Sequence, residues 1–309
     1  MKRSNEYLRP DLLAQITGIG LRANRAVEGS ITGLHSSPLH GLSPEFADYS
    51  EYTAGDDIKN LDWRTYARSN RFYIKRFEDE SNLRATLVVD GSNSMRYGSG
   101  DLTKYDCAAT VAVSLAGLLL KQRDSVGLVI DNTQERVESR PQATQSQLSK
   151  IIDMLESTAP DGQTDLGSCL AMLADRIKGR GLVILISDLL TPLETLYEAL
   201  GKLKYGGHEI ILFHVLDRDE IELPFNDSVQ FRDIEGDEEI FAEPWAFRKA
   251  YREAMQTFLD DVRGRCLFCG IDYLLLTTGD DLGHRLSNFL HVRLRRGTVK
   301  HQGKMASLS

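Results

Sequence analysis

The chain has 309 residues, with 37 Lys and Arg against 45 Asp and Glu, a formal net charge of −8, and is 41% hydrophobic and 27% charged. These values are typical of globular proteins and exclude disordered, collagen-like and coiled-coil classes; the acidic balance argues against nucleic-acid binding, which requires a basic surface. The longest charge-free apolar stretch, 107–120, is shorter than the about 20 residues of a membrane span. Because the basic start also lacks the apolar segment of a secretory signal, we expect a cytoplasmic protein without a membrane span.

The first 82 residues have a mixed pattern and are predicted to form a region that packs on the core. A helix is expected near 11–16, a loop rich in Gly, Ser, Pro and His over 29–44, and an edge strand near 71–80. Basic side chains between 64 and 76 are interleaved with acidic ones, which favours a solvated surface with ion pairs over a nucleic-acid site.

Short apolar runs alternate with segments of helical period between residues 83 and 296. Continuous apolar runs are typical of strands covered on both faces, and they occur at 85–89, 126–130, 182–186, 209–215 and 271–276. This alternation predicts an α/β fold with a doubly wound, mainly parallel sheet. A β-hairpin inserted at about 220–243 is expected to turn at 235–237, and residues 297–309 are expected to form a loose basic tail.

Oxygen-bearing side chains gather at one predicted edge of this sheet. Asp90, Ser92 and Ser94 follow the first apolar run, Thr164 stands before a predicted helix, and Asp188 follows the third run. Ligands of open parallel sheets bind beyond the carboxyl ends of the strands, and carboxylate and hydroxyl oxygens suit Mg²⁺ or Mn²⁺. Each group alone also fits a helix cap or a polar turn, but their joint pattern is more specific.

The order and placement of these residues resemble the metal-ion-dependent adhesion site of the von Willebrand factor A domain, over about residues 83–290. The resemblance implies one Mg²⁺ or Mn²⁺ ion, held directly or through water by Asp90, Ser92 and Ser94. It implies a switchable direct ligand at Thr164 and a water-mediated contact at Asp188. Gln163 and Leu189 stand where that family often has glycine, and neither change removes a ligand.

A second motif precedes the first predicted strand. It consists of Gly55, Asp56, Asp57, Asp62, Trp63 and Arg68. It resembles the signature of the bacterial "domain of unknown function 58" proteins, of the short type without N-terminal membrane helices. Because such genes commonly lie beside one for a MoxR-type AAA+ ATPase, the resemblance implies that partner. Two interpretations of the motif stay open, a binding patch for the partner and a structural turn.

Evidence for enzymatic chemistry is weak in the sequence. Cys266 and Cys269 form a CxxC pair without a second pair of soft ligands, so we expect structural thiols. The chain lacks a Walker A phosphate loop and a recognisable nucleophile–base pair. We therefore expect a non-enzymatic protein that binds an acidic residue of a partner through the ion and works with the ATPase in assembly or regulation of other proteins. The alternative is a Mg²⁺-dependent hydrolase using the same site, with Asp106 or Asp165 as its base, although both carboxylates also fit the first turn of a helix.

Overall fold

The structure, a computed structural model, describes residues 7–17, 19, 21, 45–51, 65–66, 71–78, 83–132, 136–232 and 239–306. The chain divides into two compact units, one of residues 26–82 and one of residues 1–25 together with 83–309. Helix α1 (Pro10–Thr17) packs against α3 and α9 of the larger unit. The sequence had grouped this helix with the rest of the first 82 residues, whereas its apolar side chains Leu12 and Ile16 are buried in the larger unit.

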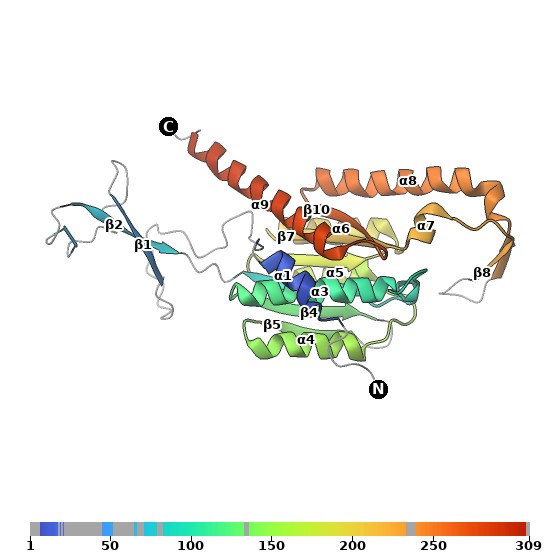
Figure 1. Ribbon diagram of the computed structural model, residues 1–309, viewed down its shortest axis with the longest axis horizontal. Helices are drawn as coiled ribbons and strands as arrows, with labels where there is room; N and C mark the ends of the chain where they lie inside the picture. Colours follow the sequence, from blue (N-terminus) through green and yellow to red (C-terminus); the bar gives the residue numbers. More distant parts are fainter. Residues whose placement is uncertain are drawn as a thin grey trace. The chain divides into compact units, whose positions relative to one another are not determined.

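The smaller unit contains an antiparallel pair formed by β1 (Glu45–Glu51) and β2 (Tyr73–Glu78) (Figure 1). β2 is the segment expected to be an edge strand. It pairs with β1 in a separate two-stranded sheet, so it does not extend the main sheet.

The main sheet has six strands in the order β10-β7-β6-β3-β4-β5. Their bounds are β3 Arg84–Asp90, β4 Ser125–Asp131, β5 Val137–Gln142, β6 Leu182–Ser187, β7 Glu209–Leu216 and β10 Asp272–Thr277. Neighbouring strands are parallel except β4 and β5. The five predicted strands are confirmed. β5 was not predicted, because its polar, mostly exposed side chains and Pro141 suit only an edge strand and give no apolar run.

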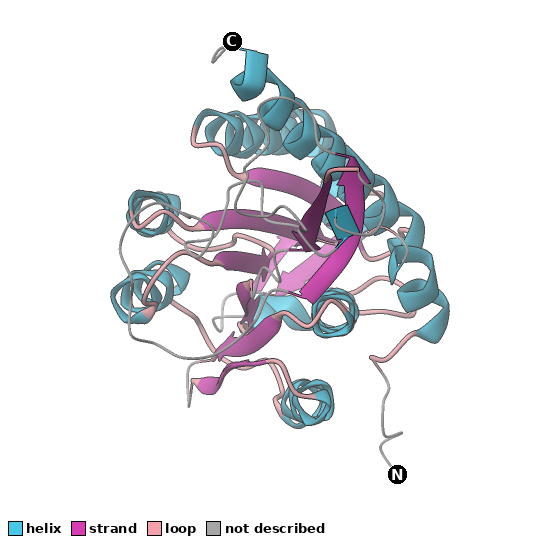
Figure 2. Cartoon of the chain, turned by 90° about the vertical axis from the view of Figure 1, so that its left-hand side faces the viewer, coloured by secondary structure: helices cyan, strands magenta, loops and turns pink. Residues whose placement is uncertain are grey.

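Helices cover both faces of this sheet, which confirms the doubly wound arrangement (Figure 2). Their bounds are α3 Lys104–Lys121, α4 Gln145–Ser157, α5 Leu166–Arg176, α6 Leu193–Tyr205, α7 Arg218–Glu222, α8 Pro244–Phe268 and α9 Leu282–Ala306. None of the described helices is both long and apolar enough to cross a membrane.

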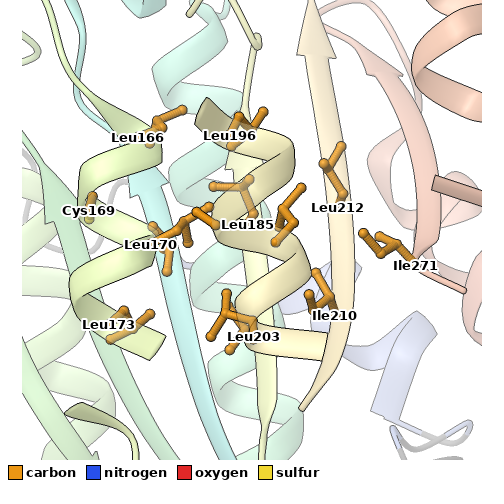
Figure 3. Close-up of a cluster of buried hydrophobic side chains, with 14 of the residues drawn as sticks. Leu166, Cys169, Leu170, Leu173, Leu185, Leu196, Leu203, Ile210, Leu212 and Ile271 are labelled. Carbon is orange, nitrogen blue, oxygen red and sulfur yellow. The ribbon is translucent and has the colours of Figure 1, made fainter. Parts of the chain in front are cut away.

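The two faces of the sheet have separate apolar cores. On one face, side chains of α5, α6 and α8 pack against β6 and β7, with Leu170, Leu203 and Leu212 among them (Figure 3). Phe213, the next residue of β7, meets Phe289 of α9 edge to face, with ring centroids 5.3 Å apart. Successive residues of a strand point to opposite faces, so β7 is buried on both sides. Each fully buried Leu or Phe stabilises the fold by about 1.5–3 kcal/mol.

The two remaining predictions concern segments outside the layered core. β8 (Val229–Arg232) and β9 (Glu239–Ala242) pair antiparallel where the hairpin was expected; the expected turn at 235–237 lies outside the described residues. The backbone of α9 is helical to Ala306, so the expectation of a loose tail over 297–309 was wrong for most of that stretch. The basic composition suggested a loose tail, but extending a formed helix adds one hydrogen bond per residue fixed.

A buried carboxyl group lies at the opposite, amino end of the central strands. Asp124 precedes β4, is buried, and accepts a hydrogen bond from the backbone N–H of Leu83 at 3.0 Å. Burial raises the pKa of Asp124 to about 7, although this hydrogen bond opposes the change. The native state therefore holds the proton more tightly than the unfolded state does, and that contribution to stability is lost as the pH rises from about 4 to about 7.

We predict that Asp124→Asn stabilises the protein at high pH, because the amide keeps the acceptor oxygen and avoids a buried charge. The free energy of unfolding should rise by about 2 kcal/mol at pH 8 and change little at pH 4. Urea denaturation at both pH values measures this difference, with the exposed Asp153→Asn on α4 as the control. An equal effect of Asp124→Asn at the two pH values would contradict the assignment.

Candidate functional site

The candidate site lies where the winding of the sheet reverses. After β3 the chain proceeds to β4 on one side, and after β6 it proceeds to β7 on the other, so the carboxyl ends of neighbouring β3 and β6 flank a topological switch point. Such a point leaves a crevice in which open α/β sheets bind ligands. Asp90 is the last residue of β3, and Asp188 directly follows β6.

A tight turn after β3 presents two serine hydroxyls. Gly91 donates its N–H to the Asp131 carbonyl at 2.8 Å, and a Cβ atom at Gly91 would lie 2.7 Å from that same oxygen, so only glycine fits there. The chain then makes a short 3-10 turn at Asn93–Arg96. The hydroxyl oxygens of Ser92 and Ser94 consequently lie 3.0 Å apart, and both side chains are buried.

Backbone hydrogen bonds hold the loop before α5 against this turn. Asn93 donates to the Gly162 carbonyl at 2.7 Å, and Asp161 donates to the Gly91 carbonyl at 2.8 Å. Thr164 Oγ1 thereby reaches Asp90, donating to Oδ1 at 3.1 Å. The cap of α5 is the next residue, Asp165, which accepts from the Ser168 N–H, so Thr164 is not occupied as an N-cap.

Asp188 joins the same cluster from the other strand. Its Oδ2 accepts a hydrogen bond from Ser94 Oγ at 2.7 Å, and its Oδ1 accepts from the Leu190 N–H at 3.1 Å. The carboxyl groups of Asp90 and Asp188 belong to residues only 2% and 1% exposed. The five residues that the sequence singled out are thus brought together by the fold, from three separate loops.

Asp90 is stabilised mainly by uncharged donors. Oδ1 accepts from the Ser92 N–H at 2.9 Å, and Oδ2 accepts from Ser187 Oγ at 2.6 Å. Burial, with the neighbouring Asp188 carboxylate, raises the pKa of Asp90 to about 6, and the hydrogen bonds from Ser187 and Ser92 oppose this rise. A bound cation would favour the charged form of this group.

Asp188 has a cationic partner that the sequence did not reveal. Lys104, the first residue of α3, is 0% exposed, and its Nζ lies 2.8 Å from Asp188 Oδ2 and 2.6 Å from Glu220 Oε1. Desolvation lowers the pKa of Lys104, but the two carboxylates outweigh it and raise the pKa above its usual value. The side chain is therefore a buried ammonium ion between two acidic groups.

The signals for these missed residues were weak in the sequence. A lysine in the first turn of a helix opposes the helix dipole, so Lys104 was unusual there, yet nothing indicated that it is buried. Ser187 ends an otherwise apolar run and fixes the geometry by donating to Asp90 and accepting from the Leu189 N–H at 2.9 Å. Glu220 lies in the predicted insertion, about which the sequence gave no contacts.

Two further residues hold the backbone at Asp188. His214 of β7, expected to be a core residue with satisfied hydrogen bonds, donates Nε2–H to the Asp188 carbonyl at 2.9 Å and accepts at Nδ1 from the Tyr273 hydroxyl at 3.0 Å. Burial lowers the pKa of His214 to about 4, so the ring is neutral. Leu189 has a left-handed backbone conformation with φ of 58°, which costs about 1–2 kcal/mol for a residue other than glycine. Its side chain is buried in the core.

The donor set of the cluster fits a hard cation. No group of three or more His, Cys, Asp and Glu side chains in the described part of the chain could hold a metal ion. Asp90 and Asp188 supply two carboxylates, and two serines and Thr164 supply three hydroxyls within hydrogen-bond distance of one another or of the carboxylates. Oxygen donors of this kind suit Mg²⁺ or Mn²⁺.

The other residues considered in the sequence are not part of this cluster. Asp106 forms a capping box with Thr103 at the start of α3, as expected for a first-turn carboxylate. Cys266 is buried and Cys269 is exposed, and neither forms a disulfide. The second motif (Gly55, Asp56, Asp57, Asp62, Trp63 and Arg68) lies outside the described residues, so both of its interpretations stay open.

Comparisons with known proteins identify a family. The profile of the family described as "Protein of unknown function DUF58" matches residues 48–258. The uncharacterized proteins Rv1480 of Mycobacterium tuberculosis and Mb1516 of Mycobacterium bovis are each 27% identical over 300 residues, covering 95% of this chain and 93% of theirs. Among solved structures, an aerotolerance-related membrane protein from Bacteroides fragilis is 15% identical, with 69% of this chain and 99% of that chain covered and a TM-score of 0.47. The SpRpn10 VWA domain is 9% identical, with coverage of 66% and 93% and a TM-score of 0.38.

We predict that Lys104→Met destabilises the fold in chelator-treated protein, because it leaves the buried Asp188 carboxylate without its cation. The free energy of unfolding should fall by about 3 kcal/mol. Adding Asp188→Asn to Lys104→Met should recover part of this loss, because both charges are then gone. Chemical denaturation of the two variants tests the pair, with Lys121→Met at the exposed end of the same helix as the control. Strictly additive effects of the two substitutions would contradict the interaction.

Proposed function

The chain belongs to the DUF58 family, and from this premise and the geometry of the cluster we propose that it is a non-enzymatic, Mg²⁺-dependent module that binds other proteins. The observation that supports the proposal most directly is the convergence of Asp90, Asp188 and three hydroxyl groups at the switch point. These are the same five residues whose order and placement in the sequence resemble the von Willebrand factor A adhesion site.

The ion's role follows from its preferred coordination. Mg²⁺ takes six oxygen ligands and keeps several waters, so a site of five side chains, some acting through water, leaves a position for an outside oxygen. The bound ion would supply a positive centre for that oxygen. Because this cluster contributes only two carboxylates, an anionic third ligand is favoured, and an Asp or Glu side chain of a partner is the simplest one.

The chain's own residues have distinct tasks in this proposal. Asp90 and Asp188 would hold the ion with their negative charges, and the hydroxyl oxygens of Ser92 and Ser94 would supply neutral ligands beside them. Thr164 is only partly buried and stands at the mouth of the cluster. It is therefore the residue placed to exchange between Asp90 and the ion.

The hydrolase alternative has less support. Its two candidate bases already have structural tasks, since Asp106 accepts from the N–H of Thr103 and Asp165 accepts from the N–H of Ser168. Their carboxylates stabilise helix starts, so neither is held ready to take a proton from a water molecule.

The proposed partner is a MoxR-type AAA+ ATPase or another protein with an exposed acidic residue, in the cytoplasm. The ATPase and the compartment rest on the resemblance and the composition alone.

We predict that the chelator-treated protein binds one Mg²⁺ or Mn²⁺ ion and that Asp90→Asn weakens this binding at least about tenfold, because it removes one of two charges facing the ion. Isothermal titration calorimetry measures both affinities, with the exposed Asp153→Asn as the matched control. Absence of binding at millimolar ion, or equal binding by Asp90→Asn, would refute the site.

We also predict that the immobilised protein retains a MoxR-type ATPase in Mg²⁺ buffer and releases it in chelator. Thr164→Ala should reduce retention severalfold, because it removes the hydroxyl at the mouth of the site, whereas the exposed Thr257→Ala on α8 should not. Mass spectrometry of the retained proteins gives the result. Equal retention under all conditions would show that the ion is not the contact, and turnover of a phosphoester that depends on Asp188 would favour the hydrolase.

A further inference from the structure

Lys104 places a fixed positive charge inside the candidate ion site. Its Nζ donates a hydrogen bond to Asp188 Oδ2, the same oxygen that accepts a hydrogen bond from Ser94 Oγ. One of the proposed ion ligands is thus already bound to a cation of the chain itself. The ammonium group has no access to water, because the residue is fully buried.

A divalent ion and this ammonium group cannot share Asp188 without cost. Two positive charges a few ångströms apart repel, and the repulsion is stronger in a buried site than in water. Lys104 therefore opposes the binding of the ion that Asp90 and Asp188 attract.

The structure also provides a second acceptor for the ammonium group. Glu220 Oε1 lies 2.6 Å from Lys104 Nζ, and Glu220 is fixed in a capping box of α7, where its Oε2 accepts from the Asp217 N–H at 2.7 Å. The carbonyl of Glu220 accepts in addition from the Tyr251 hydroxyl at 2.5 Å. Lys104 can therefore give up Asp188 and keep a charged partner.

We propose that Lys104 is a tethered cation that competes with the divalent ion for Asp188, and that Glu220 takes over the ammonium group when the ion binds. The inference rests on the proposed ion site and adds the residue pair that sets its affinity. The Lys104–Asp188 ion pair stabilises the site without an ion. The ion must then displace this internal charge before an outside acidic ligand can bind.

The test is a comparison of Mg²⁺ and Mn²⁺ affinities in the full chain by calorimetry, at one pH and one ionic strength. Lys104→Met removes the competitor and should tighten binding about tenfold or more. Lys121→Met makes the same chemical change at an exposed position of α3 and should leave the affinity unchanged. Glu220→Gln removes the negative charge of the second acceptor and leaves a neutral amide oxygen. Binding should weaken severalfold, because the ammonium group is then held more strongly by the Asp188 carboxylate.

The outcomes separate this inference from the proposed function. Equal affinities of wild type and Lys104→Met would overturn the competition and leave the ion site intact. Binding by Lys104→Met alone would support the competition and refute a Mg²⁺-dependent function of the natural protein. If neither binds an ion, both ideas are wrong. Should Lys104→Met fail to fold, Glu220→Gln decides, since unchanged or tighter binding in that variant overturns the competition.

Discussion

Two carboxyl groups in the interior, at the carboxyl edge of the sheet, impose the main constraint on this structure. A buried, uncompensated charge costs several kcal/mol, so the surrounding loops must supply donors to both groups. Asp90 receives them from the Ser187 and Thr164 hydroxyls and the Ser92 N–H, and Asp188 receives them from Ser94 and from the Lys104 ammonium group. Loops that are far apart in the sequence are held together by these bonds.

The layered core fixes where these donors stand. β3, β6 and β7 are buried on both faces, so their carboxyl ends cannot shift without disturbing packing on two sides. His214 of β7 extends this rigidity to the Asp188 backbone, because its neutral ring links the Asp188 carbonyl to Tyr273 of β10. A site built on strand ends in this way is more precisely held than one built on loops alone.

The sequence was sufficient for the fold and for the residues whose position follows from local pattern. Continuous apolar runs indicate the parallel strands and their burial on both faces, and the carboxyl ends of such strands place Asp90 and Asp188 at one edge of the sheet. It was insufficient for β5, whose exposed polar side chains give no strand signal, and for the end of α9, where the helix continues into the basic tail. Lys104 could not be found because its role depends on Glu220, which lies 116 residues away in the chain.

The two carboxyl groups are stabilised by different kinds of donor. Asp90 has neutral donors, whereas Asp188 has a charged one. Burial together with the neighbouring Asp188 carboxylate raises the pKa of Asp90 to about 6. Asp188 is paired with a fixed ammonium ion. The donors to both groups belong to the chain itself, in contrast to a zinc finger, in which metal binding supplies the folding free energy. An ion at this edge of the sheet would act on a scaffold that is already complete, and its binding energy would be available for recognition of an outside ligand.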